Sequence, residues 1–251
     1  MTTRMLFNEE MRSLNQEIIR MGDLAREMIK KGVQAFLEND ADLRSKVEEL
    51  DHQIYLTEQA IEKHCVEIVA LHQPVAGDLR MVTTSLKIIT DLNRIGRYGQ
   101  DISELAGNGE GGKRMKKLVA VPLMAELVMG MVNDAIGSFV NRDDGMARGL
   151  FIRDDEIDSL WDSIFRESLT HMMEDPRNIG VGIHYILVAR YLERIADHSC
   201  NIGDRVVFMV TGERMDPYAK KHHGETRPVR RSDDHDLVPT EGYYSTHLSE
   251  K

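Results

Sequence analysis

Oxygen-bearing side chains recur at helical spacing near the end of the last apolar-patterned segment. Four of them are separated by four, four and three positions: Glu193, Asp197, Asn201 and Asp204. An earlier row with a spacing of four includes Asp154 and Asp158. Because residues three or four apart share one face of a helix, each row would form an oxygen-rich stripe. Helical bundles hold hard or borderline cations with ligands from several helices, so the two rows predict a metal site.

The stripe has a second interpretation as a charged helix face in solvent. Two arginines, Arg190 and Arg194, lie within one turn of the acidic residues and offer them local ion pairs. Most charged rows on helices lie at the surface, which favours this interpretation for either row taken alone. His198 also has two interpretations, as a residue that ligates or orients a ligand, or as a hydrogen-bonded histidine at a helix interface.

The sequence offers no nucleophile with the partners that catalysis needs. A ferritin-like oxidase would need a Glu-x-x-His pair from each of two helices, and this spacing occurs once, at Glu49 and His52. We therefore expect His52 at the surface or paired with another side chain. The glycines from Gly107 to Gly112 lack the preceding strand and the Gly-Lys-Ser/Thr of a phosphate loop. A non-enzymatic protein is the prediction.

Six amphipathic segments must position these side chains. Each carries apolar residues three or four positions apart, as helices do, over about 8–38, 41–72, 77–106, 122–140, 146–173 and 179–210. Prolines mark two of the breaks, at Pro74 and Pro176, because proline cannot continue a helix. Short connections between long helices predict antiparallel bundles.

The two halves of the chain repeat each other. The segment DLNRIGRYGQDI (91–102) lies 100 positions before YLERIADHSCNI (191–202), and both contain Arg-Ile at the same place. We therefore predict an all-α fold of two tandem three-helix bundles related by internal duplication. The expected divisions are 1–106 for the first bundle, 107–117 for a linker, 118–216 for the second bundle and 217–251 for a disordered tail.

Charge and composition exclude several classes of function. The 251 residues carry a formal charge of −10. A protein that binds nucleic acid directly usually carries an excess of basic residues, so direct binding is not expected. The most apolar run, 118–132, is too short to span a bilayer, so membrane insertion is not expected. The first residues, MTTRMLFNEEMRS, do not read as a signal peptide, which favours the cytoplasm.

The sequence resembles the PhoU family over about residues 5–215. The likeness lies in QPVAGDLRMVTTSLKIITDLNRIG of the first half, and in DPRNI and YLERIADHSCNIGDRVVFMVTG of the second. It implies a pair of three-helix bundles that acts as a negative regulator of phosphate uptake and phosphate-starvation signalling. The implied partners are the ATPase of the phosphate ABC transporter and the phosphate sensor histidine kinase. We also expect a homodimer.

The resemblance also bears on the metal site. Some members of the family bind iron or zinc through a Glu/Asp-x-x-x-Asp motif in each repeat, and the second repeat keeps this motif at Glu193 and Asp197. The first repeat has Asn93 and Arg97 at these positions, where a guanidinium repels a cation. Iron or zinc is therefore expected only in the second repeat, and Arg97 is expected to pair with Asp101. The alternative function is a carboxylate-rich metal-binding bundle with a metal-storage or metalloenzyme role.

Overall fold

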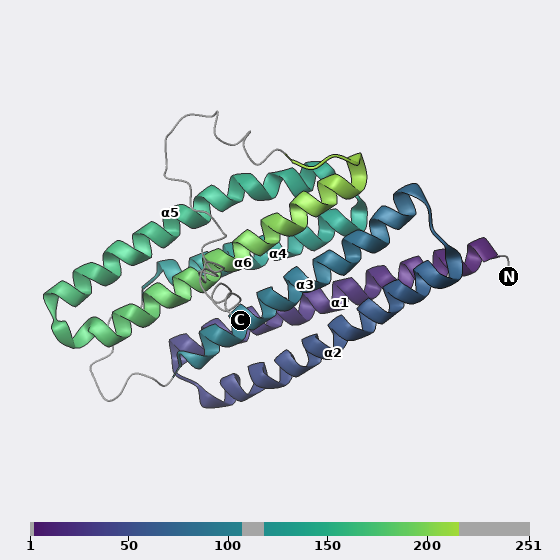
Figure 1. The fold of residues 1–251 in the computed structure, drawn as a ribbon. Coiled ribbons are helices and arrows are strands. Elements are labelled where there is room, and N and C mark those ends of the chain that lie inside the picture. The colour runs from purple at the N-terminus through teal and green to yellow at the C-terminus, as the bar shows by residue number, and fades with distance from the viewer. Residues whose placement is uncertain (1–2, 107–117, 216–251) are drawn as a thin grey trace, which may run out of the picture. The chain divides into compact units, whose positions relative to one another are not determined.

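A computed structural model describes residues 3–106 and 118–215 of the chain (Figure 1). These residues form long helices, namely α1 (Thr3–Glu38), α2 (Ala41–His72), α3 (Ala76–Glu104), α4 (Ala120–Asn141), α5 (Asp144–Glu174) and α6 (Ile179–Thr211). A short 3₁₀ helix, η1 (Pro176–Asn178), precedes α6. The all-α prediction is confirmed. The expected linker and tail lie outside the described residues.

Helix boundaries follow from local chemistry. Asp40 caps α2 by accepting hydrogen bonds from the backbone N–H groups of Asp42 and Leu43, at 2.9 and 3.1 Å. Asp143 caps α5 in the same way, and Gly212 closes α6 with a left-handed φ of 82°. α2 ends at His72, and its C-cap residue Gln73 directly precedes Pro74, as the sequence predicts.

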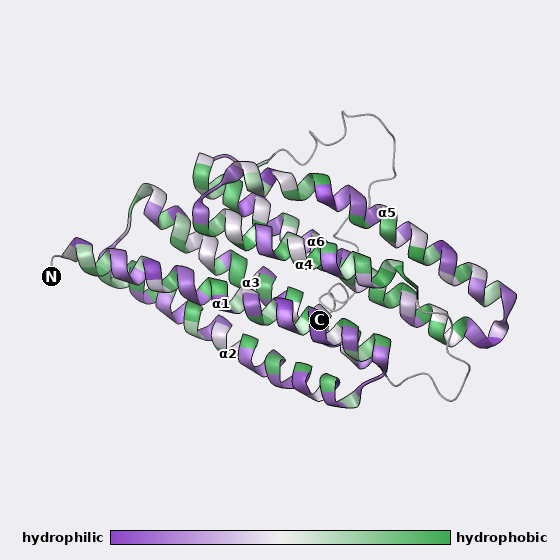
Figure 2. Ribbon diagram, turned by 180° about the vertical axis from the view of Figure 1, so that it is seen from behind, coloured by the Kyte–Doolittle hydropathy of each residue, from purple (hydrophilic) through white to green (hydrophobic). Residues whose placement is uncertain are grey.

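The helices pack as two groups of three, α1–α3 and α4–α6, that meet along α3 and α6 and along α1 and α4 (Figure 1). Every helix carries hydrophobic and hydrophilic residues on different sides, which Figure 2 shows as green and purple stretches. The buried core is built from aliphatic side chains and methionines, including Leu14, Ile54, Ile95 and Met131.

Helix α4 is the most apolar of the described helices. Its length and composition would allow it to cross a membrane, but half of its most apolar window is buried in the protein. Its buried residues include Val128, Val132 and Phe139, and it packs against α1, α5 and α6. This agrees with the interpretation of the segment as a core helix.

Two glycines allow α1 and α3 to approach closely. A Cβ atom added to Gly32 would lie 2.1 Å from the backbone oxygen of Gly99, and one added to Gly99 would lie 2.8 Å from the backbone nitrogen of Ile29. Neither contact leaves space for a methyl group. The crossing of α1 and α3 therefore requires glycine at both positions.

Candidate functional site

Glu193, the first residue of the predicted stripe, is buried on α6. It is 6% exposed and accepts a hydrogen bond from Arg190, one turn earlier. Asp197 is more open, with 46% of its side chain exposed, and its Oδ2 lies 3.5 Å from Nη1 of Arg194. Glu193 and Asp197 therefore each hold a local arginine, as the second interpretation of the stripe predicts, but the burial of Glu193 departs from the solvent-exposed face of that interpretation.

The environment of Asp197 disfavours its negative charge. Burial raises the pKa of this carboxyl group, and the charge of Glu193 raises it further. The positive charges of Arg194, Arg190 and His198 act in the opposite direction but do not cancel the rise. Glu193 and Asp197 thus repel each other in spite of their arginine partners.

The other candidate metal ligands differ in their exposure and in their partners. Asn201 is exposed, and the carboxylate of Asp204 accepts a hydrogen bond from the backbone N–H of Met215 at 3.2 Å. Asp154 and Asp158 are half-buried on α5, which packs beside α6. Within 3–106 and 118–215, no three His, Cys, Asp or Glu side chains are grouped so that they could hold a metal ion. The donor set as it stands does not fit a preassembled metal centre.

The first repeat places a cation where the second has a carboxylate. Nη1 of Arg97 lies 3.8 Å from Oδ2 of Asp51 on α2, so its ion pair is with Asp51, while it acts on the expected partner Asp101 through its charge. The pair joins two helices, which local spacing along one helix does not reveal. Burial raises the pKa of Asp101, as do the charges of Glu104 and Asp51, while Arg97 lowers it. Asn93 donates a hydrogen bond to Glu58, also on α2.

A buried polar cluster joins the two repeats. Nδ1 of His198 lies 2.9 Å from Oδ1 of Asp91 on α3, and Nε of Arg205 donates to Oδ2 of the same carboxylate at 3.3 Å. Asp91 is 6% exposed and His198 is 9% exposed. His198 is therefore a hydrogen-bonded interface histidine, the second of its two interpretations. His52, in contrast, is exposed on α2.

An aromatic pair occupies the positions that the internal repeat makes equivalent to Asp91 and His198. The rings of Tyr98 and Tyr191 stack with centroids 5.9 Å apart. Tyr98 is equivalent to His198, and Asp91 is equivalent to Tyr191, by the offset of 100 positions. Exchanging the repeats thus converts the Asp91–His198 contact into the Tyr191–Tyr98 contact, as an approximate two-fold relation requires. Asp91 was not among the predicted residues, although a charged residue on the apolar face of its helix is the signal that marks it.

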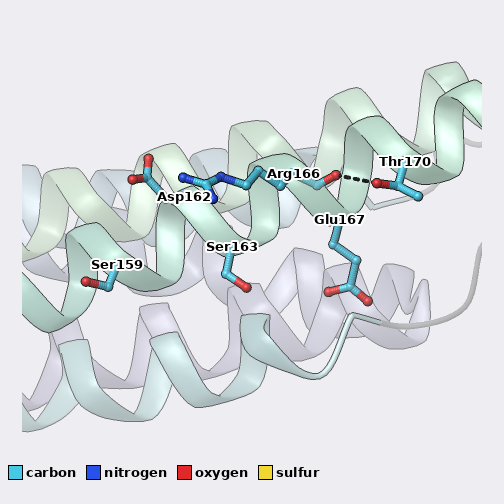
Figure 3. A pocket seen from close by; sticks show the side chains of 6 residues that line it. All are labelled: Ser159, Asp162, Ser163, Arg166, Glu167 and Thr170. Carbon is cyan, nitrogen blue, oxygen red and sulfur yellow. Dashed lines mark hydrogen bonds between the residues drawn. The ribbon is translucent and has the colours of Figure 1, made fainter.

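A shallow pocket along α5 has no catalytic arrangement. It is lined by Ser159, Asp162, Ser163, Arg166, Glu167 and Thr170, all from this one helix (Figure 3). The Thr170 hydroxyl donates a hydrogen bond to the backbone oxygen of Arg166 at 3.0 Å, so this hydroxyl is used in a local contact within the helix. With hydroxyls and charges of both signs and no histidine or cysteine, this lining is that of an exposed helix face.

Comparison with known proteins gives consistent matches. The family model for the PhoU domain matches residues 18–106 and again 121–206. The phosphate-specific transport system accessory protein PhoU homolog of Aquifex aeolicus is 36% identical over 217 residues, covering 86% of this chain and 98% of that protein. The homolog of the same description from Rhizobium meliloti is 35% identical and covers 82% of this chain and 87% of its own.

Two solved structures share the fold. The structure of PhoU from Pseudomonas aeruginosa has a TM-score of 0.74 at 33% identity, and the match covers 82% of this chain and 100% of that one. The structure of the phosphate transport system regulatory protein PhoU from Streptococcus pneumoniae has a TM-score of 0.76 at 27% identity. That match covers 84% of this chain and 99% of the other.

Proposed function

The chain belongs to the PhoU family, and on that premise we propose that it restrains phosphate uptake and phosphate-starvation signalling by direct protein contact. Family membership makes it an accessory or regulatory protein of a phosphate transport system, and the family is non-enzymatic. The observation that carries the proposal is the double match of the PhoU domain, once in each repeat. The proposed partners are the ATPase of the phosphate ABC transporter and the phosphate sensor histidine kinase, in the cytoplasm.

The buried polar cluster and the pocket along α5 both have structural explanations. Polar groups that are buried deeply, such as Asp91 and His198, are engaged with each other between the repeats. The pocket along α5 is open and belongs to one helix face. We also propose that the regulator works as a homodimer, for which sedimentation of the full chain should give about twice its mass of 28.6 kDa.

Deleting the gene should raise the output of a phosphate-starvation reporter several-fold in phosphate-rich medium, because the restraint on the sensor kinase is lost. Reporter fluorescence in matched cultures measures the effect, and the intact gene on a plasmid should restore the low level. Affinity purification of the tagged protein from phosphate-replete cells should recover the transporter ATPase or the sensor kinase. An unchanged reporter in the deletion strain would contradict the proposed regulation.

A cation bound at Glu193 and Asp197 remains a second proposal. It is supported by the raised pKa of Asp197 beside Glu193, since two carboxylates that repel each other gain from a shared cation. Binding requires Arg190 and Arg194 to release these carboxylates, because both now pair with them. Asn201, Asp204, Asp154 and Asp158 are the further oxygen donors proposed for this ion.

Changing Glu193 and Asp197 together to alanine should remove the iron, zinc or manganese that the purified protein retains. Asn93→Ala, at the position equivalent to Glu193, is the matched control and should leave the metal content unchanged. Elemental analysis after dialysis measures both, and added metal should raise the melting temperature of the metal-free parent by mass action. Equal metal content in the parent and the double variant would refute the site.

A further inference from the structure

His64, on α2, lies between two carboxylates of α1. Its Nδ1 is 2.9 Å from Oε2 of Glu17, and its Nε2 is 2.8 Å from Oε2 of Glu10. A neutral imidazole has one N–H and cannot donate to two carboxylates, whereas an imidazolium donates from both nitrogens. The geometry is therefore that of a protonated histidine that bridges two helices.

We propose that protonated His64 is a pH-sensitive latch that holds the first turns of α1 against α2 and releases them when the ring loses its proton.

The segment that would be released has few other anchors. The buried apolar residues of α1 begin at Met11, while Met5 and Leu6 are 51% and 42% exposed. Ahead of Met11, Phe7 packs on the ring of His72 with centroids 5.5 Å apart. Because little apolar surface is buried there, the contact with His64 is a large share of what holds these turns.

Glu10 and Glu17 differ in how easily each can break its contact with His64. Glu10 is the more open, with 48% of its side chain exposed, and lies at the start of the helix. Glu17 is 28% exposed, and its other oxygen accepts a hydrogen bond from Ser13 at 3.2 Å. A neutral ring that keeps one hydrogen bond therefore keeps the one with Glu17. The Glu10 carboxylate then faces an unprotonated nitrogen and turns toward water.

The charges around the ring set its titration. Burial lowers the pKa of His64, but the hydrogen bonds and charges of Glu17 and Glu10 raise it by more, so the net pKa lies above 6.5. From α2 itself, Lys63 is paired with Glu67 at 3.7 Å. The neighbouring Cys65 thiol is neutral, because burial and the charges of Glu17 and Glu62 raise its pKa to about 12. Among the described residues of α3, no charged group contributes to the pKa of His64; the carboxylates that do so are both on α1.

The sign of the pH dependence follows from linkage. Because the folded-state pKa of His64 is above the unfolded value, its stabilising contribution is complete below about pH 6.5. It is lost as the pH rises through the folded-state pKa. The latch is thus closed under acidic conditions and opens under alkaline ones.

Hydrogen exchange of the full chain tests the latch. Protection factors of the amides of residues 7–12, which donate within the helix, should fall about tenfold between about pH 5.5 and about pH 8.5 after correction for intrinsic exchange, since one charge-assisted hydrogen bond is lost. His64→Gln should show the low protection at every pH. His52→Gln, which changes an exposed histidine of the same helix, should retain the pH dependence of the parent.

Two further measurements make the test decisive. NMR of the histidine-labelled protein should give His64 a pKa above 6.5, and Glu10→Gln should lower that pKa and weaken the pH dependence of protection. Glu10→Gln also serves if His64→Gln fails to fold. A His64 pKa at or below 6.5, or protection that changes equally with pH in the parent and in Glu10→Gln, would overturn the latch.

Discussion

Gly32→Ala is expected to lower the free energy of unfolding by about 3 kcal/mol, among the largest effects of a single methyl group in this protein. The added Cβ would lie 2.1 Å from the backbone oxygen of Gly99, and a backbone atom cannot rotate away as the end of a side chain can. α1 and α3 must separate, which opens the core of the first repeat. Thermal unfolding should show a melting temperature lowered by roughly 6–12 °C.

Gly149→Ala is the matched control, since it makes the same change in the interior of α5. A Cβ atom there meets nothing within 4 Å, so alanine should be neutral or should stabilise by up to about 1 kcal/mol through its better helix propensity. Gly99→Ala should resemble Gly32→Ala. Equal melting temperatures for Gly32→Ala and Gly149→Ala would mean that the close crossing of α1 and α3 is wrong.

Asp91→Ala is expected to cost about 3 kcal/mol, because it leaves His198 and Arg205 without their shared acceptor at a buried interface. The loss should appear as a lower midpoint in urea unfolding followed by circular dichroism. The repeats lose the carboxylate that ties α3 to α6, although the Tyr98–Tyr191 stack remains.

The control for this change is a carboxylate in an exposed ion pair. Glu67 pairs with Lys63 at the surface of α2, with 53% of its side chain exposed, and Glu67→Ala should change stability by less than about 1 kcal/mol. If Asp91→Ala costs no more than Glu67→Ala, the buried cluster does not stabilise the contact between the repeats.

Local patterns in the sequence were sufficient to predict the helices. The stop before Pro74 and the start of α2 at Ala41 agree with the structure, because a proline and an aspartate cap act within a few residues. The start of α1 at Thr3 lies five residues before the predicted one, since apolar spacing is weak ahead of Met11. The 3₁₀ turn after Asp175 was not predicted.

Contacts across the bundle were harder to predict than contacts along one helix. The ion pair of Arg190 with Glu193 spans three positions and follows from spacing alone. The contacts of Arg97 with Asp51 and of His198 with Asp91 span 46 and 107 positions, and they depend on how helices are placed against one another. The predicted metal-site residues have helical spacing within α5 and within α6, but this spacing does not make their oxygens converge on one point.

The unequal contacts between the repeats favour pairing of the first repeat with the second over pairing of two first repeats. Two first repeats paired in the same way would place each Asp91 against Tyr98 and Leu105, in place of the histidine and arginine that now surround it. Each carboxylate would then be buried without a cationic partner, which is costly. A first repeat could therefore not take the place of the second without leaving a buried carboxylate unpaired.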